Sequence, residues 1–404
     1  MKKVWLLGFG FFSISITWSL YNAFVPFFLE KYVHSVALIS FMMTIDNYFA
    51  LFLQPWIGNR SDRTSSRYGR RMPYLMLGMP FAAVLTMLIP FHTGLFTLLL
   101  YMMLMNLAMS LYRSPTVALM PDITPDTYRT KANGFINFMG GVGSILAFGV
   151  GSILYEANPA FPFIVAGLIT LLCLFIVSHY IKEHRDSVNQ GLDPVKTGIT
   201  SPPSRISFRG QLDRTTGWLL AAIFFWFVAY QGVETLFTLY GKHHLGLSEQ
   251  AASFSLTFFS LAFVAFAIPS GWLGGRFGKK KMIILGVCGL IAVYSLVGFA
   301  KDLLVLRSLL LLGGLFWACI NINSYPYVVA TGTEESIGTR TGMYYLVSSL
   351  AAISSPPLLG LLIDQFDYSI LFYVAAISMI AALLCLVMMT GRRKSASSFH
   401  SPGA

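Results

Sequence analysis

Charged residues are scarce in this chain. Asp, Glu, Lys and Arg make up 11% of its 404 residues, whereas hydrophobic residues make up 55%. A soluble globular domain carries about 25% charged residues, so the composition excludes a chain that exposes most of its surface to water. Acidic residues are the rarest charged group, and of the 17 present only Asp46 and Glu234 fall well inside apolar runs.

Motifs for chemistry are equally sparse. The histidines lie in loops, at the ends of apolar runs or in the C-terminal tail, and no P-loop, nucleophile elbow or zinc motif occurs. The sequence therefore predicts neither an enzyme nor an ATP-driven pump, and it predicts no cofactor and no metal site. The cysteines lie in apolar runs without metal-ligand spacing, which predicts small core residues at Cys173, Cys288, Cys319 and Cys385.

Long apolar runs are what the chain has in abundance. A helix needs about 20 apolar residues to cross a bilayer. Twelve runs meet this length, at approximately 4–29, 36–58, 73–92, 95–118, 131–155, 160–181, 215–240, 250–275, 281–300, 303–328, 338–362 and 366–390. The first run is too long for a signal peptide and lacks a clear cleavage site. We predict an all-α polytopic membrane protein with 12 transmembrane helices that contact the lipid bilayer.

The basic residues predict how these helices are oriented. With the N-terminus in the cytoplasm, 23 of the 28 Lys and Arg residues fall in inside loops or tails, as the positive-inside rule requires. Both termini are then cytoplasmic, and the compact loops favour a multi-pass protein of a plasma membrane, the bacterial inner membrane. Topology accounts for the net charge of +11, so we expect no nucleic-acid partner, and we expect a monomer.

The chain divides into two similar halves. Trp18 with Tyr21 in the first half corresponds to Trp226 with Tyr230 about 208 residues later. Two parallel six-helix repeats joined by a cytoplasmic loop are the layout of major facilitator transporters; chance similarity between apolar helices is the alternative. The predicted parts are an N-terminal six-helix bundle at 1–181, a flexible cytoplasmic linker at 182–214, a C-terminal six-helix bundle at 215–390 and a cytoplasmic tail at 391–404.

The loop after the second predicted helix carries the strongest motif. A glycine there lets two helix ends approach, and an aspartate can pair with arginine or cap a helix N-terminus. We predict a cytoplasmic gate motif whose contacts hold the inner side shut and break when it opens. A basic loop that only fixes topology is the alternative. The motif consists of Gly58, Asp62, Arg63, Arg67, Gly69, Arg70 and Arg71.

Two stretches, from Gln54 to Pro73 and from Pro115 to Phe135, resemble the sucrose:proton symporter-like branch of the glycoside–pentoside–hexuronide cation symporters. In the second stretch that family shows a short acidic loop and then a helix that starts with Arg-x-x-Ala-Asn. The resemblance covers the N-terminal half well and the C-terminal half mainly through the repeat. It implies a major facilitator fold of two six-helix bundles in pseudo-twofold repeat, glycoside-type substrates and cation-driven uptake.

The chain departs from this family at positions that matter for coupling. Plant sucrose carriers have a protonatable aspartate nine residues before the proline that matches Pro115, and here that position is Asn106. The family arginine two residues after the proline is Val117 here, although Arg113 lies about one helical turn away. The coupling group therefore has to be sought elsewhere in the membrane.

Ionisable groups inside a membrane are costly and usually face a cavity or a partner. Asp46 lies roughly 18 Å from the cytoplasmic end of its predicted helix, near the midplane, and Glu234 lies in the outer part of the seventh. We hypothesise that Asp46, or failing that Glu234, takes up the coupling proton, with Arg113 as a charge partner. A static pair of Asp46 and Arg113 that only fixes helix packing is the alternative.

Polar and aromatic side chains share helix faces on four predicted spans, because residues four apart lie on one side of a helix. Aromatic faces stack on the C–H surface of a sugar, and amides bind its hydroxyls. The resemblance implies that the first, fourth, seventh and tenth helices line the central cavity. Side chains that only join helices are the alternative. The predicted sugar site comprises Trp18, Tyr21, Asn22, Asn106, Trp226, Tyr230, Gln231, Trp317, Asn321 and Tyr325.

These features predict a secondary active transporter that imports a sugar or glycoside, a di- or oligosaccharide, by cation symport through alternating access. Its partners are a small-molecule substrate and a coupling cation, with the proton favoured over sodium. One alternative is a facilitator or proton-coupled exporter of a small organic solute. Another is a non-transporting sugar sensor, which the short tails argue against because they leave little surface for an effector.

Overall fold

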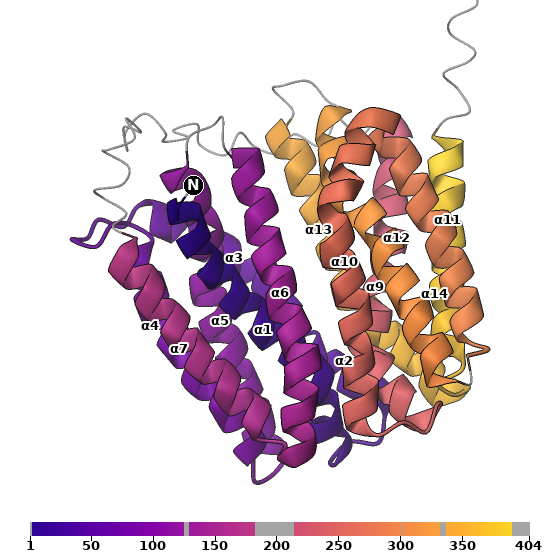
Figure 1. The fold of residues 1–404 in the computed structure, drawn as a ribbon, viewed down its shortest axis with the longest axis horizontal. Coiled ribbons are helices and arrows are strands. Elements are labelled where there is room, and N and C mark those ends of the chain that lie inside the picture. Colours follow the sequence, from indigo (N-terminus) through magenta and orange to yellow (C-terminus); the bar gives the residue numbers. More distant parts are fainter. Residues whose placement is uncertain (1, 125–128, 182–213, 301, 332–336, 390–404) are drawn as a thin grey trace, which may run out of the picture.

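The computed structural model describes residues 2–124, 129–181, 214–300, 302–331 and 337–389, and over these residues it contains helices and no strand (Figure 1). The first half holds α1 (Lys2–Glu30), α2 (Val36–Met43), α3 (Ile45–Asp62), α4 (Met72–Leu88), η1 (Ile89–Phe91), α5 (Leu95–Ile123), α6 (Arg129–Ala157) and α7 (Phe161–Tyr180). The second half holds α9 (Arg214–His243), α10 (Glu249–Phe277), α11 (Lys279–Val297), α12 (Leu303–Ala330), α13 (Ile337–Gln365) and α14 (Ile370–Met388). Among the described residues, 12 spans are long and apolar enough to cross a membrane. The predicted all-α fold class is confirmed.

The second span differs from the single helix predicted at 36–58. It consists of two helices, α2 and α3, with Thr44 between them. The Thr44 amide donates to the carbonyls of Ser40 and Phe41, and its hydroxyl donates to the Phe41 carbonyl at 2.9 Å. These bonds satisfy the backbone at the break, as the hydrocarbon region of a membrane demands. The break places Asp46 in the first turn of α3.

The two halves form two bundles that lie side by side in Figure 1, the first in indigo to magenta and the second in orange to yellow. Within the first bundle α1 packs against α6 and α7, and within the second α9 packs against α13 and α14. The pairs α3 with α5 and α4 with α7 correspond in the same way to α10 with α12 and α11 with α14. Each bundle therefore repeats one packing arrangement.

Two glycines show how closely the repeat is kept. A Cβ on Gly78 of α4 would lie 3.2 Å from the Ala108 carbonyl oxygen of α5. A Cβ on Gly286 of α11 would lie 2.6 Å from the Phe316 carbonyl oxygen of α12. Both the glycine and the carbonyl recur after 208 residues, the offset found in the sequence. In each bundle a small residue at this position lets the two backbones approach.

The bundles meet mainly along two pairs of helices, α6 with α10 and α2 with α13, with smaller contacts such as α1 with α9 and α3 with α13. We call the end of the molecule that carries Glu30, at the end of α1, the outer end, following the predicted orientation, and the opposite end the inner end. The predicted linker, apart from Arg214, and the predicted tail at 391–404 lie outside the described residues, so the proposed division into domains stays a prediction.

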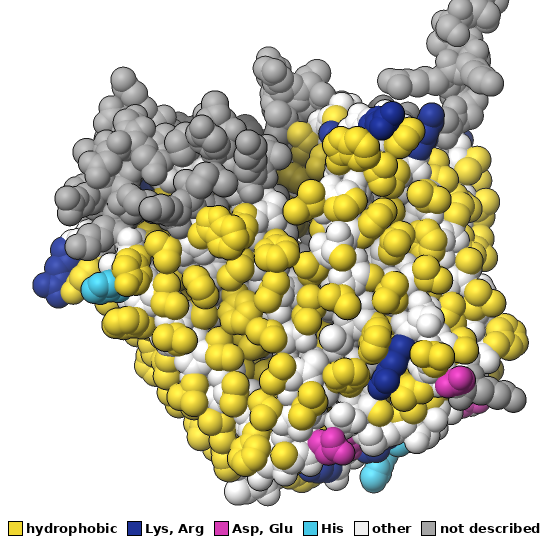
Figure 2. Space-filling view, in the orientation of Figure 1, with side chains coloured by type: hydrophobic (Ala, Val, Ile, Leu, Met, Phe, Trp, Pro, Cys, Tyr) yellow, Lys and Arg dark blue, Asp and Glu magenta, His cyan; other side chains and the backbone are white. Residues whose placement is uncertain are grey.

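Hydrophobic side chains cover most of the face shown in Figure 2, and charged side chains lie mainly towards its two ends. Phe52, Phe96 and Leu304 are each more than 70% exposed, which suits contact with lipid rather than water. Among the cysteines, Cys173, Cys319 and Cys385 are buried, but Cys288 is exposed. The prediction that all four cysteines are core residues was therefore wrong for Cys288, because an apolar run does not tell the packed face of a helix from its lipid face.

Candidate functional site

A cavity of about 290 Å³ lies between the two bundles. Helices α1 and α6 supply one wall, and α9, α10 and α12 supply most of the other, with further side chains from α11 and α14. Its size is at the low end of pockets that hold small organic ligands, roughly 300 to 1,000 Å³. The polar lining residues are Ser15, Ser19, Asn137, Ser144, Tyr230, Glu234, Ser260, Tyr294 and Asn321.

An aromatic pair lies beside the partly buried carboxyl group of Glu234. The rings of Tyr230 on α9 and Trp317 on α12 stack with their centroids 3.9 Å apart and their planes 3° from parallel. The Tyr230 hydroxyl also makes a hydrogen bond with the carboxyl group of Glu234, one turn further along α9. Asn321 lies one turn from Trp317 on α12 and lines the same cavity. Four of the residues singled out in the sequence thus meet at one place.

A second polar cluster lies within the N-terminal bundle. The rings of Trp18 and Tyr21 on α1 meet edge to face at 5.7 Å, and the Asn106 amide of α5 donates to the Tyr21 hydroxyl at 3.4 Å. The Arg113 guanidinium lies 6.0 Å from the centre of the Trp18 ring. The buried amide oxygen of Asn106 has no hydrogen-bond partner among the described residues, which is costly in a dry site.

The intramembrane ionisable groups Asp46, Arg113 and Glu234 interact with one another without forming an ion pair among the described residues. One Asp46 oxygen accepts a hydrogen bond from the side-chain amide of Asn47 at 3.1 Å. No ion pair joins Asp46 to Arg113 within the part of the chain that the structure describes, although the two groups interact electrostatically. Asp46 also interacts electrostatically with Glu234 of the opposite bundle. Asp46 therefore interacts electrostatically with an ionisable group in each bundle.

The remaining predicted sugar-site residues do not line the cavity. Trp226 is fully buried inside the C-terminal bundle, although it shares a helix face with Tyr230. Tyr325 lies further along α12, where its hydroxyl makes a hydrogen bond with Thr341 at 3.2 Å. Asn22 and Gln231 are only partly buried and are also absent from the cavity wall. Of the four helices predicted to line the cavity, α1, α9 and α12 contribute to its wall, whereas α5 does not, and the contributions of α6 and α10 were not predicted.

Sequence reasoning missed the cavity residues of the opposite wall. Ser15 and Ser19 lie one turn apart on α1, and the Ser19 hydroxyl donates to Ser144 of α6 at 2.8 Å. A stripe of serines at helical spacing was the available signal.

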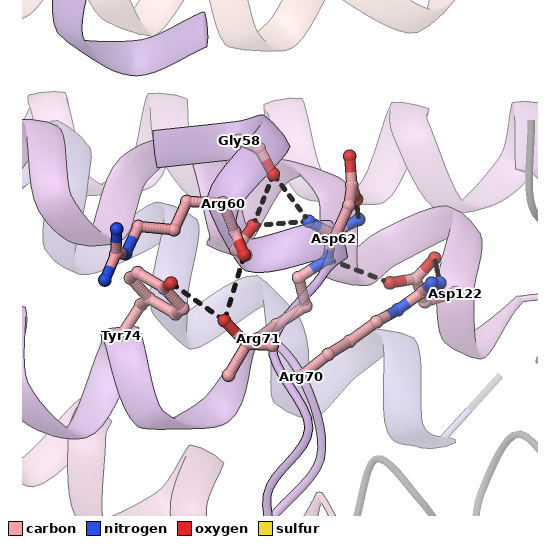
Figure 3. A network of polar contacts seen from close by, with 9 residues as sticks. Gly58, Arg60, Asp62, Arg70, Arg71, Tyr74 and Asp122 are labelled. Carbon is pink, nitrogen blue, oxygen red and sulfur yellow. Dashed lines mark hydrogen bonds and ion pairs between the residues drawn. The ribbon is translucent and has the colours of Figure 1, made fainter. Parts of the chain in front are cut away.

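The predicted gate motif forms a polar network at the inner end (Figure 3). Arg71 is buried, pairs with Asp62 at the end of α3, and places its Nε 3.1 Å from an Asp122 oxygen at the end of α5. Arg70 contacts the other Asp122 oxygen at 2.7 Å. A Cβ on Gly58 would lie 3.0 Å from the Ser114 hydroxyl of α5. Each contact drawn in Figure 3 joins residues of the N-terminal bundle.

The other members of the motif have different surroundings. Gly69 has a φ of 105°, a conformation that L side chains rarely adopt, and it turns the chain between α3 and α4. The Arg67 guanidinium lies 4.6 Å from the centre of the exposed Tyr68 ring. Arg63 is the C-cap residue of α3. The network therefore depends on Arg70 and Arg71, while Arg63 and Arg67 lie outside the contacts drawn.

The model of the Major Facilitator Superfamily matches residues 7–255 and 240–404 of the chain. This chain belongs to the major facilitator superfamily. A solved structure of the nucleoside transporter NupG superimposes with a TM-score of 0.78 at 14% sequence identity, covering 96% of this chain and 99% of that chain. At this identity the likeness shows the fold, and it agrees with the repeat described above.

Curated relatives differ in what they are named for. The tetracycline resistance protein of class B from Escherichia coli is 23% identical over 295 residues, which cover 72% of this chain and 71% of that protein. The isoprimeverose transporter from Lactiplantibacillus pentosus is 24% identical over 301 residues, covering 68% of this chain and 60% of that protein. The chain is thus a transporter-family protein that is similar both to a sugar carrier and to a resistance protein.

Proposed function

We propose that this protein is a proton-coupled secondary transporter that imports a sugar or glycoside by alternating access, as a monomer of the plasma membrane with both termini in the cytoplasm. One observation carries the proposal: Glu234 lies on the wall of an inter-bundle cavity, bonded to Tyr230 beside the stacked Trp317 ring. A carboxyl group in contact with the binding cavity can exchange a proton and at the same time sense whether the cavity is occupied.

The surroundings of Glu234 support a coupling role. It is the only charged side chain that lines the cavity over the described part of the chain. A carboxylate away from water is unfavourable without a compensating cation, so cargo or proton uptake changes the energy of this site. Asp46, in the other bundle, interacts electrostatically with Glu234. We therefore place Glu234 first and Asp46 second as the group that takes up the proton.

Uptake into proteoliposomes tests this function. Radiolabelled isoprimeverose and sucrose serve as probes, with and without an inward proton gradient. We expect one of them to accumulate only under the gradient, and a protonophore to abolish accumulation. No accumulation of any glycoside under a gradient contradicts the proposal.

Two substitutions then separate the candidate coupling groups. Glu234→Gln keeps the shape of the side chain and removes its charge, so we expect loss of gradient-driven accumulation with retention of exchange between labelled and unlabelled sugar. Asp46→Asn tests the second group in the same way. Glu156→Gln is the control, because Glu156 is an exposed carboxylate near the outer end of α6. Accumulation that survives Glu234→Gln but not Asp46→Asn assigns the role to Asp46.

One observation favours a second function, the export of an amphipathic organic solute. Seven of the lining residues are phenylalanines, and they surround the single carboxyl group. Such a lining suits a flat, largely apolar cargo, and the similarity to a tetracycline resistance protein points the same way. Tetracycline accumulation in inverted vesicles tests it, because an exporter moves its cargo into their lumen. Proton-driven accumulation of tetracycline, together with no glycoside uptake, would replace the import proposal.

A further inference from the structure

The two bundles are joined at the outer end by a chain of charged groups. The Lys242 Nζ, at the end of α9, lies 2.9 Å from a Glu30 oxygen of α1 and 2.9 Å from a Glu249 oxygen of α10. The other Glu249 oxygen accepts a hydrogen bond from the Tyr155 hydroxyl of α6 at 2.8 Å. His243 also contacts Glu30. Starting from α1, the chain of contacts crosses to the second bundle and returns to the first.

A second connection between the bundles lies at the same end. The carboxyl group of Asp364, near the end of α13, accepts hydrogen bonds from the amides of Val36 and Ala37 at 2.7 and 3.1 Å, and from the Ser35 hydroxyl at 2.6 Å. Ser35 is the N-cap of α2, so a carboxylate of one bundle caps a helix of the other. An anion at a helix N-terminus is stabilised by the free amides and by the helix dipole.

These contacts are more than surface ion pairs. The side chain of Glu30 is 19% exposed and that of Lys242 is 33% exposed, and the ammonium group also lies 5.4 Å from the centre of the Phe27 ring. Partial burial weakens screening by water, and an amine that bridges two carboxylates makes two charge-assisted hydrogen bonds at once. Separation of the bundles at this end breaks the Lys242–Glu30, Tyr155–Glu249 and Asp364 contacts together, while the Lys242–Glu249 pair stays within the second bundle.

We propose that Glu30, Tyr155, Lys242, Glu249 and Asp364 form an outer latch that closes the cavity towards the outer side and has to break in every transport cycle. The latch goes beyond the proposed function, because it fixes which side of the cavity is closed and does not depend on the cargo. Lys242 is its central residue, since it alone bonds to acidic groups from both bundles in the described contacts.

Cysteine accessibility tests the latch without any cargo. Ser144→Cys places a thiol on the cavity wall, and Cys288→Ser removes the exposed native thiol. A membrane-impermeant maleimide is added to right-side-out vesicles, and the labelling rate at position 144 is measured. We expect Lys242→Gln to raise this rate about tenfold, the equivalent of roughly 1.4 kcal/mol. In inside-out vesicles the same substitution should lower the rate.

Lys31→Gln is the matched control. Lys31 lies next to Glu30 at the outer end, but its ammonium group lies over the Phe28 ring of its own bundle, 5.3 Å from the ring centre. Tyr155→Phe is the milder second variant, because it keeps the ring stacked on Phe24 and removes only the hydroxyl that crosses to α10. We expect it to raise outside labelling about threefold, and Lys31→Gln to leave labelling unchanged.

Equal outside labelling in Lys242→Gln and Lys31→Gln would overturn the latch. If Lys242→Gln speeds labelling from both sides, the variant has lost its packing and Tyr155→Phe decides, with an unchanged rate again overturning the latch. Because the readout needs neither sugar nor gradient, failure of the latch is distinguishable from failure of the import proposal.

Discussion

Gly360 offers the sharpest test of how the outer end is closed. It lies on α13 one turn before Asp364, against the start of α2. A Cβ at this position would lie 2.7 Å from the Ala37 Cα and 2.8 Å from both the Ala37 amide nitrogen and the Val36 carbonyl oxygen. Non-bonded carbon atoms prefer about 3.5 to 4.0 Å, so Gly360→Ala forces the two helices apart by about 1 Å. The obstacle is backbone, which cannot rotate away.

The expected size follows from the cost of overpacking. Extra methyl groups in tight packing typically cost about 1 to 3 kcal/mol, and here the cost falls only on the conformation in which α2 and α13 touch. At about 1.4 kcal/mol per factor of ten, labelling of the Ser144→Cys reporter from the outside should rise by roughly five- to 150-fold. The greater helix propensity of alanine, about 1 kcal/mol relative to glycine, does not change this ratio, because it stabilises α13 equally whether or not α2 is in contact.

Gly149→Ala is the control for this experiment. Gly149 lies on α6 at the other contact between the bundles, where a Cβ would meet Thr257 of α10 at the ordinary distances of 3.5 and 3.6 Å. We expect its labelling rate to stay near that of the parent. Labelling of Gly360→Ala at the parent rate, or more slowly, would show that the contact between α2 and α13 is not what closes the outer end.

Three further predictions concern the inner network and the cavity. Arg71→Ala should lower the thermal stability of the purified protein, since breaking a buried ion pair costs about 3 to 5 kcal/mol. Arg67→Ala is the control and should leave it unchanged, because Arg67 lies beside an exposed tyrosine ring. Equal melting temperatures for the two variants would contradict the assigned contacts. Gly69→Ala should lower the same melting temperature, because the φ of 105° costs an L residue about 1 to 2 kcal/mol, and an unchanged value would show that the turn relaxes. Tyr230→Ala should raise the KM for the transported solute at least about tenfold, because it removes the stacked aromatic wall. Tyr325→Ala, outside the cavity, should leave the KM unchanged. The reverse pattern would show that the solute binds further along α12, near Tyr325.

The fold could be predicted from the sequence because few kinds of structure can span a membrane. Apolar runs of sufficient length gave the spans, and the offset of 208 residues gave the repeat that Gly78 and Gly286 display in three dimensions. The break at Thr44 was not readable, because no proline or glycine lies beside it and an apolar run long enough to span a membrane continues through it. The hydrogen bonds of Thr44 to the Ser40 and Phe41 carbonyls depend on local backbone geometry, which hydropathy does not predict.

The site was only partly readable, for a related reason. Helical spacing placed Trp226, Tyr230 and Glu234 on one face, yet Trp226 is packed inside its own bundle while the other two line the cavity. The packing of the whole bundle decides which turns of a helix contact its neighbours and which face the cavity. The spacing of residues within one helix does not contain this information. The contact of Lys242 with Glu30 could not be read from the sequence, because the two residues lie 212 positions apart, although the other partner, Glu249, is only seven residues away.

The cavity and the latch share one rigid element. Helix α9 carries Tyr230 and Glu234 on the cavity wall and Lys242 at the outer latch, and the last two are eight residues, or about 12 Å, apart along the axis. Because a helix moves as a unit over such a distance, a shift of α9 on cargo or proton uptake also changes the distances from Lys242 to Glu30 and Glu249. A ligand can move a conformational equilibrium only through contacts that differ between the states. In the proposed cycle the contacts of α9 change both at the cavity wall and at the outer latch, so occupancy of the cavity can offset the cost of breaking the latch.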